Sequence, residues 1–398
     1  MNPMKSLACL GGAPAFPEKL HVGRPNVGNR ERFLELVGEI FDRRWFSNNG
    51  ECVREFERRM CALLGVRHCI PVCNATVGLE VAIRALGLRG EVIIPSFTFI
   101  ATAHALQWQE ITPIFCDVDP LTHNLDPARV EQLITPRTTG IIGVHLWGRA
   151  CDTEALAAIA KRHSLRLLFD AAHAFGCSHH GTMIGNFGDA EVFSFHATKF
   201  MNTFEGGAIA TNDDALAARI RLMINFGFSG LDNVIDIGTN GKMNEVCAAM
   251  GITGMENLEP FIATNLINFR AYEAELRGVP GLEFMPLPEN ERFNAQYVIL
   301  EVDETRFGLS RDELLRVLHA DNVLARRYFY PGCHRQQPYI SLYPNTGQLL
   351  PETERLCTRV LALPTGTSIG AEEIDRVGSI IRTAHTRAAE IHQHFQSA

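Results

Sequence analysis

Short apolar runs alternate with helical patterns through the first two thirds of the chain. Seven of these runs are typical of strands: 68–73, 91–95, 113–119, 140–147, 165–170, 190–195 and 206–212. Amphipathic segments with helical spacing lie between them, such as "TEALAAIAKRHS" at 153–164. Strands that alternate with helices of this length favour a mostly parallel sheet with helices on both faces. We therefore expect an α/β fold with a seven-stranded sheet.

The pattern changes near residue 255. A long helical segment runs through "NLEPFIATNLINFRAYEAELRG", and two strand-like pieces follow, "LEFMPL" and "AQYVILEVD". A further helix, a loop rich in Pro and Gly at 331–351, and a final helical segment complete the chain. This succession predicts a smaller α+β unit. We expect a large domain at 1–255, which includes the N-terminal segment, and a small C-terminal domain at 256–398.

The composition is that of a globular protein with a large core. Hydrophobic residues make up 46% of the 398 residues and charged residues 21%. The net charge is −8 and there is no long basic run, so we expect no nucleic acid partner. No apolar run approaches the roughly 18 residues that span a bilayer, and the N-terminus lacks a signal-peptide pattern. We therefore expect no membrane partner.

The eleven cysteines are scattered from Cys9 to Cys357, and none form a CxxC pair. Several fall in strand-like apolar runs, which favours reduced, buried thiols over disulfides or a zinc site. His179 and His180 are the most suggestive metal pattern, but adjacent histidines in a turn rarely ligate one ion. We therefore predict no metal site and a cytoplasmic location.

Several candidate site residues follow predicted strands, and ligands of parallel sheets bind beyond the carboxyl ends of the strands. Asp170 ends one strand, Ser194 lies near the end of another with Lys199 in the loop beyond, and Phe99 follows a third. The segment Asn74–Thr76 joins a strand to a helix, where free N–H groups suit a phosphate. The same residues also suit an ordinary helix cap. No dinucleotide-binding GxGxxG motif follows a strand and no P-loop motif is present, which disfavours nicotinamide and nucleoside triphosphate sites.

Lysine is rare in this chain. Its five lysines are Lys5, Lys19, Lys161, Lys199 and Lys242, and the other cationic residues are arginines. An arginine keeps its charge, whereas a lysine can lose a proton and attack a carbonyl, so imine chemistry must use one of these five positions. Alone, Lys199 also fits a surface lysine, and Asp170 a cap or turn residue. Together, a lysine, a carboxylate, a phosphate-binding turn and an aromatic ring are what pyridoxal phosphate (PLP) requires.

Longer motifs indicate a family. The chain contains, in order and correctly spaced, "PVCNAT", "PSFTFIATAHA", "IFCDVDPLTHNLD", "GVHLWGRACD", "FDAAHAFG", "FGDAEVFSFHATKFMNTFEGGAIATND" and "YFYPGCHRQQPY". This set resembles the DegT/DnrJ/EryC1/StrS family along nearly the whole chain. Its members are PLP-dependent aminotransferases of fold type I that act on nucleotide-linked keto sugars. The resemblance therefore implies that fold, PLP as cofactor, and this activity.

The resemblance also implies catalytic roles. In the family, the Asp of the "DAAHA" motif pairs with the pyridine nitrogen of PLP, which indicates Asp170. The residue three positions on lies by the phenolic oxygen, which indicates His173. The lysine of the "SFHxTK" motif bonds covalently to the cofactor, which indicates Lys199. Asp170 and Lys199 are thus the expected catalytic residues, whereas we expect His196 of the same motif only to pack or hydrogen-bond locally.

Further residues resemble those that hold the cofactor: Ala75, Thr76, Phe99 and Ser194. Three of them match the phosphate cup, and Phe99 stands where an aromatic ring stacks on the cofactor. Asn240 in "GTNGKMNE" resembles the residue that reaches the phosphate from the neighbouring subunit, which implies a homodimer with shared active sites. The chain departs from the family pattern just after it, where Gly241 and Lys242 replace the usual aromatic residue and arginine.

The implied amino donor is glutamate, which leaves as 2-oxoglutarate. "LHVGRPNVG", "RRWFSNNG" and "YFYPGCHRQQPY" most resemble enzymes that aminate C4 of dTDP-4-keto-6-deoxyglucose. C3 amination and another nucleotide sugar stay open as alternatives. Some relatives carry His in place of the lysine and dehydrate sugars, and Lys199 argues against that class. A non-enzymatic PLP-binding regulator would need a DNA-binding segment, and none is visible.

Overall fold

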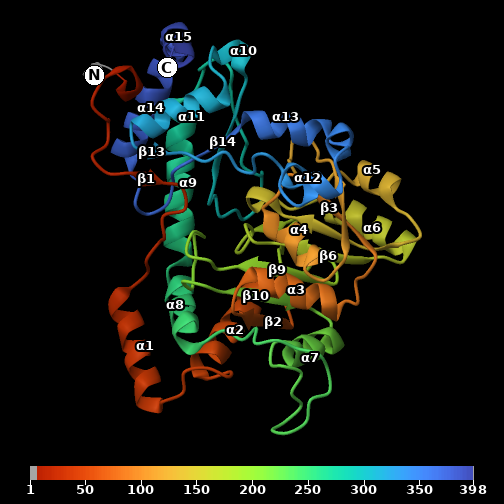
Figure 1. Cartoon of the computed structure of the whole chain (residues 1–398). Coiled ribbons are helices and arrows are strands. Elements are labelled where there is room, and N and C mark those ends of the chain that lie inside the picture. Colours follow the sequence, from red (N-terminus) through yellow and green to blue (C-terminus); the bar gives the residue numbers. More distant parts are fainter. Residues whose placement is uncertain (1–6, 398) are drawn as a thin grey trace.

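The computed structural model describes residues 7–397, and its centre is a seven-stranded sheet (Figure 1). The strand order is β2-β10-β9-β6-β5-β3-β4. Six strands are parallel to one another, and β10 runs antiparallel to both its neighbours. The strands are β2 (His68–Val72), β3 (Glu91–Pro95), β4 (Thr112–Cys116), β5 (Thr138–Val144), β6 (Arg166–Asp170), β9 (Ala190–Ser194) and β10 (Gly207–Thr211). The predicted mostly parallel sheet is confirmed, and each predicted strand overlaps one of these seven.

Helices cover both faces of this sheet because its strands are apolar on both sides (Figure 1). The residues of β3 and β9 are buried throughout, as expected for a covered parallel sheet. One face shares an apolar core with α3 (Ala75–Ala85), α4 (Ile100–Gln107) and α7 (Asp214–Met223). The opposite face packs against α2 (Glu51–Leu64), α6 (Thr153–His163) and α8 (Glu245–Glu256).

The C-terminal part of the chain has a sheet and an apolar core of its own. Its antiparallel strands are β11 (Leu282–Phe284), β12 (Val298–Val302) and β14 (Val360–Leu363). Among the helices that share this core are α9 (Leu258–Glu275), α11 (Arg311–Ala320) and α14 (Ala371–Thr386). The mixture of helices and antiparallel strands agrees with the predicted α+β character.

The N-terminal segment packs on this C-terminal core. Leu7, Phe16 and Leu20 are buried in it, and β1 (Leu20–His21) pairs in parallel with β13 (Val323–Leu324). In Figure 1 the N-terminal trace accordingly lies beside β13 and α14. The N-terminal segment was expected from the sequence to belong to the large domain. In the structure it contacts the C-terminal part of the chain. The division at residue 255 stays a prediction.

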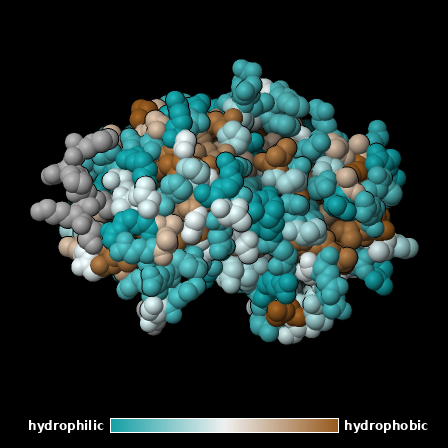
Figure 2. Space-filling view, turned by 90° about the horizontal axis from the view of Figure 1, so that it is seen from above, coloured by the Kyte–Doolittle hydropathy of each residue, from teal (hydrophilic) through white to brown (hydrophobic). Residues whose placement is uncertain are grey.

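The remaining elements are short or peripheral. The helices are α1 (Arg30–Arg43), α5 (Pro127–Val130), α10 (Glu304–Phe307), α12 (Tyr339–Leu342), α13 (Pro351–Arg359) and α15 (Ala388–Ser397). A small hairpin joins β7 (Ser178–His179) to β8 (Thr182–Met183). Within residues 7–397, no helix has the length and apolar character to cross a membrane. Seen from above, the surface is mainly hydrophilic with small scattered hydrophobic groups (Figure 2).

Polar contacts hold the C-terminal part against the carboxyl edge of the large sheet. Asp117, just beyond β4, accepts hydrogen bonds from the N–H groups of Glu352 and Thr353 at 2.9 and 2.8 Å, and so caps the start of α13. The Ser96 hydroxyl, just beyond β3, lies 2.7 Å from Nδ1 of the buried His334. These contacts enclose the strand ends where ligands of parallel sheets bind.

Candidate active site

Asp170 is the last residue of β6, and its carboxylate is fixed on both oxygens. Oδ2 accepts a hydrogen bond from Thr102 Oγ1 at 2.8 Å, and Oδ1 accepts one from the N–H of Ala172 at 3.0 Å. Only 5% of Asp170 is exposed. Burial raises the pKa of this carboxyl, and the two hydrogen bonds and the charge of Lys199 oppose part of that rise. The carboxylate is therefore oriented before any ligand binds.

Lys199 lies in the loop beyond β9, where its N–H donates to the carbonyl of His196 at 2.8 Å. Burial lowers the pKa of its amine to about 8, and the charge of Asp170 opposes this fall. The neutral amine is the form that attacks a carbonyl, and about half of the amine is neutral near pH 8. Strands β6 and β9 are neighbours, so the structure brings Asp170 and the half-buried Lys199 to one edge of the sheet, where the charge of each affects the pKa of the other.

His173 joins the same site among aromatic rings. Its ring stacks on Trp147 and on Phe329, with centroids 5.9 Å apart in each pair. Its Nδ1 accepts a hydrogen bond from the N–H of Trp147 at 3.2 Å. Burial, together with the charge of Lys199, holds the pKa of this histidine well below its usual value. His173 is therefore a neutral imidazole at physiological pH.

The start of α3 offers N–H groups to a ligand. Asn74 caps this helix, and its Oδ1 accepts a hydrogen bond from the N–H of Val77 at 2.9 Å. The N–H groups of a first helical turn have no partner inside the helix. Those of Ala75 and Thr76, together with the exposed hydroxyl of Thr76, are thus available to an anion at the positive end of the helix dipole.

Ser194 is brought to this helix start by β10. It pairs in register with Gly207 of β10. A Cβ on Gly207 would lie 2.8 Å from the N of Ala75 and 2.8 Å from the carbonyl oxygen of Phe193, so only glycine allows this close approach. The three residues predicted to bind phosphate are thus gathered at one place.

Phe99 lies beyond β3, at the N-cap position of α4, and 57% of it is exposed. Its ring centroid is 6.5 Å from that of Phe329, with the planes tilted by 59°. Since Phe329 also stacks on His173, Phe99 belongs to the same aromatic group. An exposed ring in this place is available to stack on a bound cofactor.

Asn240 is the one predicted site residue that the structure does not bring into this group. Its backbone bridges Asn225, and its exposed side chain makes no hydrogen bond in the part of the chain that is described. The carbonyl of Gly241, the next residue, accepts a hydrogen bond from the N–H of Cys73 at 2.7 Å. The loop therefore runs along the edge of the sheet, and a contact of Asn240 with a cofactor stays a prediction.

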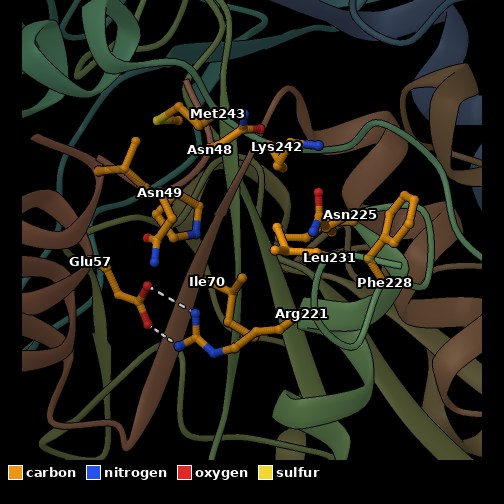
Figure 3. A pocket seen from close by; sticks show the side chains of 14 residues that line it. Asn48, Asn49, Glu57, Ile70, Arg221, Asn225, Phe228, Leu231, Lys242 and Met243 are labelled. Carbon is orange, nitrogen blue, oxygen red and sulfur yellow. Dashed lines mark hydrogen bonds and ion pairs between the residues drawn. The ribbon is translucent and has the colours of Figure 1, made fainter. Parts of the chain in front are cut away.

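A separate cavity of about 410 Å³ lies beside this loop (Figure 3). Its lining includes Asn225, Leu231 and Lys242. Glu57 and Arg221, also in the lining, form an ion pair that Figure 3 shows along one side. No residue predicted to bind the cofactor lines this cavity.

Sequence reasoning missed two residues that hold the site together. One is Thr102, a buried hydroxyl within the apolar helix α4. The other is Asn26, whose Oδ1 accepts hydrogen bonds from the N–H and hydroxyl of Thr367 at 2.9 Å, while its Nδ2 donates to the carbonyl of Phe200 at 2.8 Å. The residue after Lys199 is thereby tied to the loop before α14. Asn26 stood in the quoted segment "LHVGRPNVG", but nothing in that segment indicates its partners.

The residues gathered here fit PLP. The amine of Lys199, which loses its proton near pH 8, matches the aldehyde of PLP, and the fixed carboxylate of Asp170 matches the pyridine nitrogen. The open start of α3 matches the phosphate, and the exposed ring of Phe99 matches the ring face. As for metals, no group of three or more His, Cys, Asp or Glu among residues 7–397 is placed to hold an ion.

We predict that Lys199 of the cofactor-free protein reacts with an amine-specific acylating reagent with a midpoint near pH 8. Since the carboxylate of Asp170 raises the pKa of Lys199, Asp170→Asn should move that midpoint to lower pH. Peptide mass spectrometry after labelling at a series of pH values measures both, with the exposed Lys161 as internal reference. A midpoint at the ordinary lysine value of 10.5 would contradict the enclosed site.

Known proteins resemble this chain along most of its length. Residues 28–382 match the profile of the DegT/DnrJ/EryC1/StrS aminotransferase family. A dTDP-4-amino-4,6-dideoxy-D-glucose transaminase of Shigella dysenteriae is 37% identical over 366 residues, which cover 91% of this chain and 98% of the relative. A GDP-perosamine synthase of Caulobacter vibrioides is 34% identical over 366 residues, which cover 90% and 96%.

A solved structure shares the fold. The crystal structure of DesI in the presence of its TDP-sugar product is 49% identical, with a TM-score of 0.93 over 98% of this chain and 99% of that chain. These matches confirm the predicted fold type I, the PLP cofactor and the enzyme class, and the chain belongs to the DegT/DnrJ/EryC1/StrS aminotransferase family.

Proposed function

We propose that this protein transfers the amino group of glutamate to C4 of dTDP-4-keto-6-deoxyglucose, with PLP as cofactor. The observation that carries the chemistry is the placement of two residues. Asp170 is buried at the end of β6, and Lys199 is half-buried in the loop beyond the neighbouring strand β9, where the charge of each shifts the pKa of the other. The substrate rests on similarity. Relatives 37% and 33% identical are named dTDP-4-amino-4,6-dideoxy-D-glucose transaminases, and DesI, 49% identical, was crystallised with a TDP-sugar product.

Bound PLP supplies an aldehyde and an electron-accepting ring. Lys199 then acts as base and acid: its Nζ takes the proton from Cα of glutamate, and in the second half of the reaction it delivers a proton to C4 of the sugar. A pKa of about 8 suits both roles, because the amine exchanges protons readily near neutral pH. Asp170, held by Thr102 and Ala172, keeps a proton on the pyridine nitrogen.

The other residues of the site bind and orient. Ala75, Thr76 and Ser194 hold the phosphate at the start of α3, where the helix dipole favours an anion. Phe99 covers one face of the ring. His173, as a neutral imidazole, lies by the phenolic oxygen and can donate one hydrogen bond to it.

The protein with PLP, glutamate and dTDP-4-keto-6-deoxyglucose should form dTDP-4-amino-4,6-dideoxyglucose and an equal amount of 2-oxoglutarate, as identified by mass spectrometry and NMR. Lys199→Ala should abolish turnover yet still bind PLP, because Asp170 and the phosphate-binding residues remain. Lys161→Arg, at an exposed lysine, is the matched control and should turn over normally. Amination at C3, or turnover of a GDP-linked sugar alone, would reject the proposed substrate. The assignment of the protein as an aminotransferase would still stand.

We also propose that the protein works as a homodimer in which Asn240 reaches the PLP phosphate of the partner. Asn240 is exposed and stands apart from its own site. The adjoining loop exposes large apolar side chains: Phe226, Phe228, Leu231, Val234, Ile235 and Ile237. Apolar groups of this extent are typical of interfaces between proteins. Phe228 and Leu231 also line the cavity of Figure 3, so a second copy seated there would cover the loop and the cavity together.

We also propose that the protein is located in the cytoplasm. Each of the eleven cysteines between Cys9 and Cys357 is a free thiol, and seven of them are buried. Unpaired thiols in this number are typical of proteins in a reducing compartment, because oxidising compartments favour disulfides.

Mixed dimers test the shared site. Asn240→Ala should weaken PLP binding by roughly 5- to 150-fold, the equivalent of one hydrogen bond to a phosphate. When a Lys199→Ala subunit is paired with an Asn240→Ala subunit, crossed sites leave one site with both lesions and one with neither. About half of the activity per dimer should then survive at limiting PLP. If activity instead follows the weak PLP binding of the Asn240→Ala protein, each site is built from one chain and the shared site is wrong.

A further inference from the structure

Trp147 adopts a backbone conformation that large side chains rarely take. Its φ of 59° lies in the left-handed region, where a bulky residue is strained. It is nevertheless only 1% exposed, within the short turn η3 (Leu146–Gly148) that follows β5. Residues in this state persist where surrounding contacts hold them, and they concentrate at functional sites. This turn is next to the site, since Val144 at the end of β5 pairs with Asp170.

The turn directs one backbone donor at His173. The N–H of Trp147 lies 3.2 Å from Nδ1 of His173. Since a backbone N–H only donates, Nδ1 accepts, and a neutral imidazole then carries its proton on Nε2. His173 is 6% exposed, and no hydrogen bond of its Nε2 is found among residues 7–397. The Nε2–H group is thus a buried donor left for a ligand.

The Trp147 side chain is itself anchored. Its indole N–H, also a donor only, lies 3.2 Å from Nδ1 of His123, so His123 carries its proton on Nε2. That Nε2 donates to Oε1 of Glu301 at 3.0 Å, and Oε2 of Glu301 pairs with Arg355 at 2.6 Å. Glu301 belongs to β12. Trp147 therefore donates in two directions: its indole N–H ties it through His123 to the C-terminal sheet, and its backbone N–H contacts His173.

Ring stacking fixes the plane of the imidazole. Trp147 and His173 are within 14° of parallel, and Phe329 stacks on both, with centroids 5.3 Å from Trp147 and 5.9 Å from His173. Gly148 makes room for this arrangement. Its φ is 91°, and a Cβ there would lie 3.2 Å from the carbonyl oxygen of His173 and 3.1 Å from the ring of Phe293.

We propose that Trp147 is a positioning residue that fixes the ring plane and the Nε2–H tautomer of His173, so that His173 presents a donor to the phenolic oxygen of bound PLP. The proposal rests on the role of His173 in the proposed function. The titratable groups around His173 are Lys199, Tyr297, whose ring meets it at 4.8 Å, and His123 through Trp147. An Nε2–H donor stabilises the ionised phenolic oxygen, whereas the other tautomer would present a lone pair and favour its protonated form.

Cofactor-free protein labelled with ¹⁵N-histidine tests the tautomer. We expect His173 to give the ¹⁵N shifts of a neutral Nε2–H imidazole across about pH 6 to 8, assigned by the loss of these signals in His173→Gln. Trp147→Phe keeps the backbone N–H and a stacking ring but removes the indole donor that anchors the turn to His123. Without that anchor the backbone N–H should no longer be held against Nδ1 of His173, so the His173 shifts should move toward an average of both tautomers. Trp108→Phe changes an 81% exposed tryptophan and is the matched control, with no shift expected.

The visible absorbance of bound PLP gives a second readout. Loss of an oriented donor should raise the pH midpoint of the absorbance in Trp147→Phe by about 0.4–1 pH unit, the equivalent of one neutral hydrogen bond. Trp108→Phe should leave it unchanged. A purely structural role would lower the melting temperature and move neither the shifts nor the midpoint.

The proposal is overturned if folded Trp147→Phe protein shows the same His173 ¹⁵N shifts as the wild type. This holds whatever the absorbance of its bound PLP. If this variant fails to fold, Glu301→Gln carries the same test, because it leaves the Trp147 ring in place and weakens the anchor at His123. Failure of the wild-type protein to bind PLP would reject the proposed function instead. The ¹⁵N measurement would still decide the tautomer, since it needs no cofactor.

Discussion

The electrostatic coupling between the buried Asp170 and the half-buried Lys199 is the constraint around which the site is arranged. Ionised groups are costly to bury unless partners compensate them. Asp170 is compensated by Thr102 and Ala172, and the amine of Lys199 responds by losing its proton more readily, with a pKa of about 8. The same burial that penalises the charge thus prepares a neutral amine for carbonyl chemistry. A fold that exposed these two residues to water would lose that effect.

The parallel sheet makes this burial possible. Its strands are apolar on both faces, so helices cover them, and only the strand ends are left for polar groups. The C-terminal part then closes over that edge through the contacts of Asp117 and Ser96. Asn26 ties the N-terminal segment to Phe200 and Thr367, so three distant parts of the chain meet at the loop that carries Lys199.

Much of the fold could be predicted from local pattern. Each of the seven strands appears as a short apolar run because it is buried on both faces, and periodicity identifies such runs. The direction of β10 could not be read in this way, since an antiparallel strand buried on both faces has the same apolar character. The packing of Leu7, Phe16 and Leu20 on the C-terminal core was also missed, because it depends on contacts some 300 residues apart, as between Ala15 and Asp321.

The residues of the candidate site could also be predicted only in part. Asp170, Ser194 and Phe99 follow strands, so topology alone predicted that they converge, and the resemblance to a family assigned the roles. Thr102 and Trp147 carried no local signal. A threonine in an apolar helix is common, and the left-handed turn at Trp147 is accompanied by hydrogen bonds to His123 and His173, which are more than 20 residues away in sequence. The predicted partner of Asn240 is the cofactor phosphate of a second subunit, so its role depends on assembly and not on the fold of one chain.

The central claim is that Lys199, and no other lysine, is the residue to which the cofactor bonds. Borohydride reduction of the PLP-loaded protein makes that bond permanent, and mass spectrometry of its peptides then identifies the modified lysine. The account predicts a pyridoxyl group on the peptide that contains Lys199 and on no other peptide. A label on Lys161 or Lys242, or no label in protein that has bound PLP fully, would contradict it.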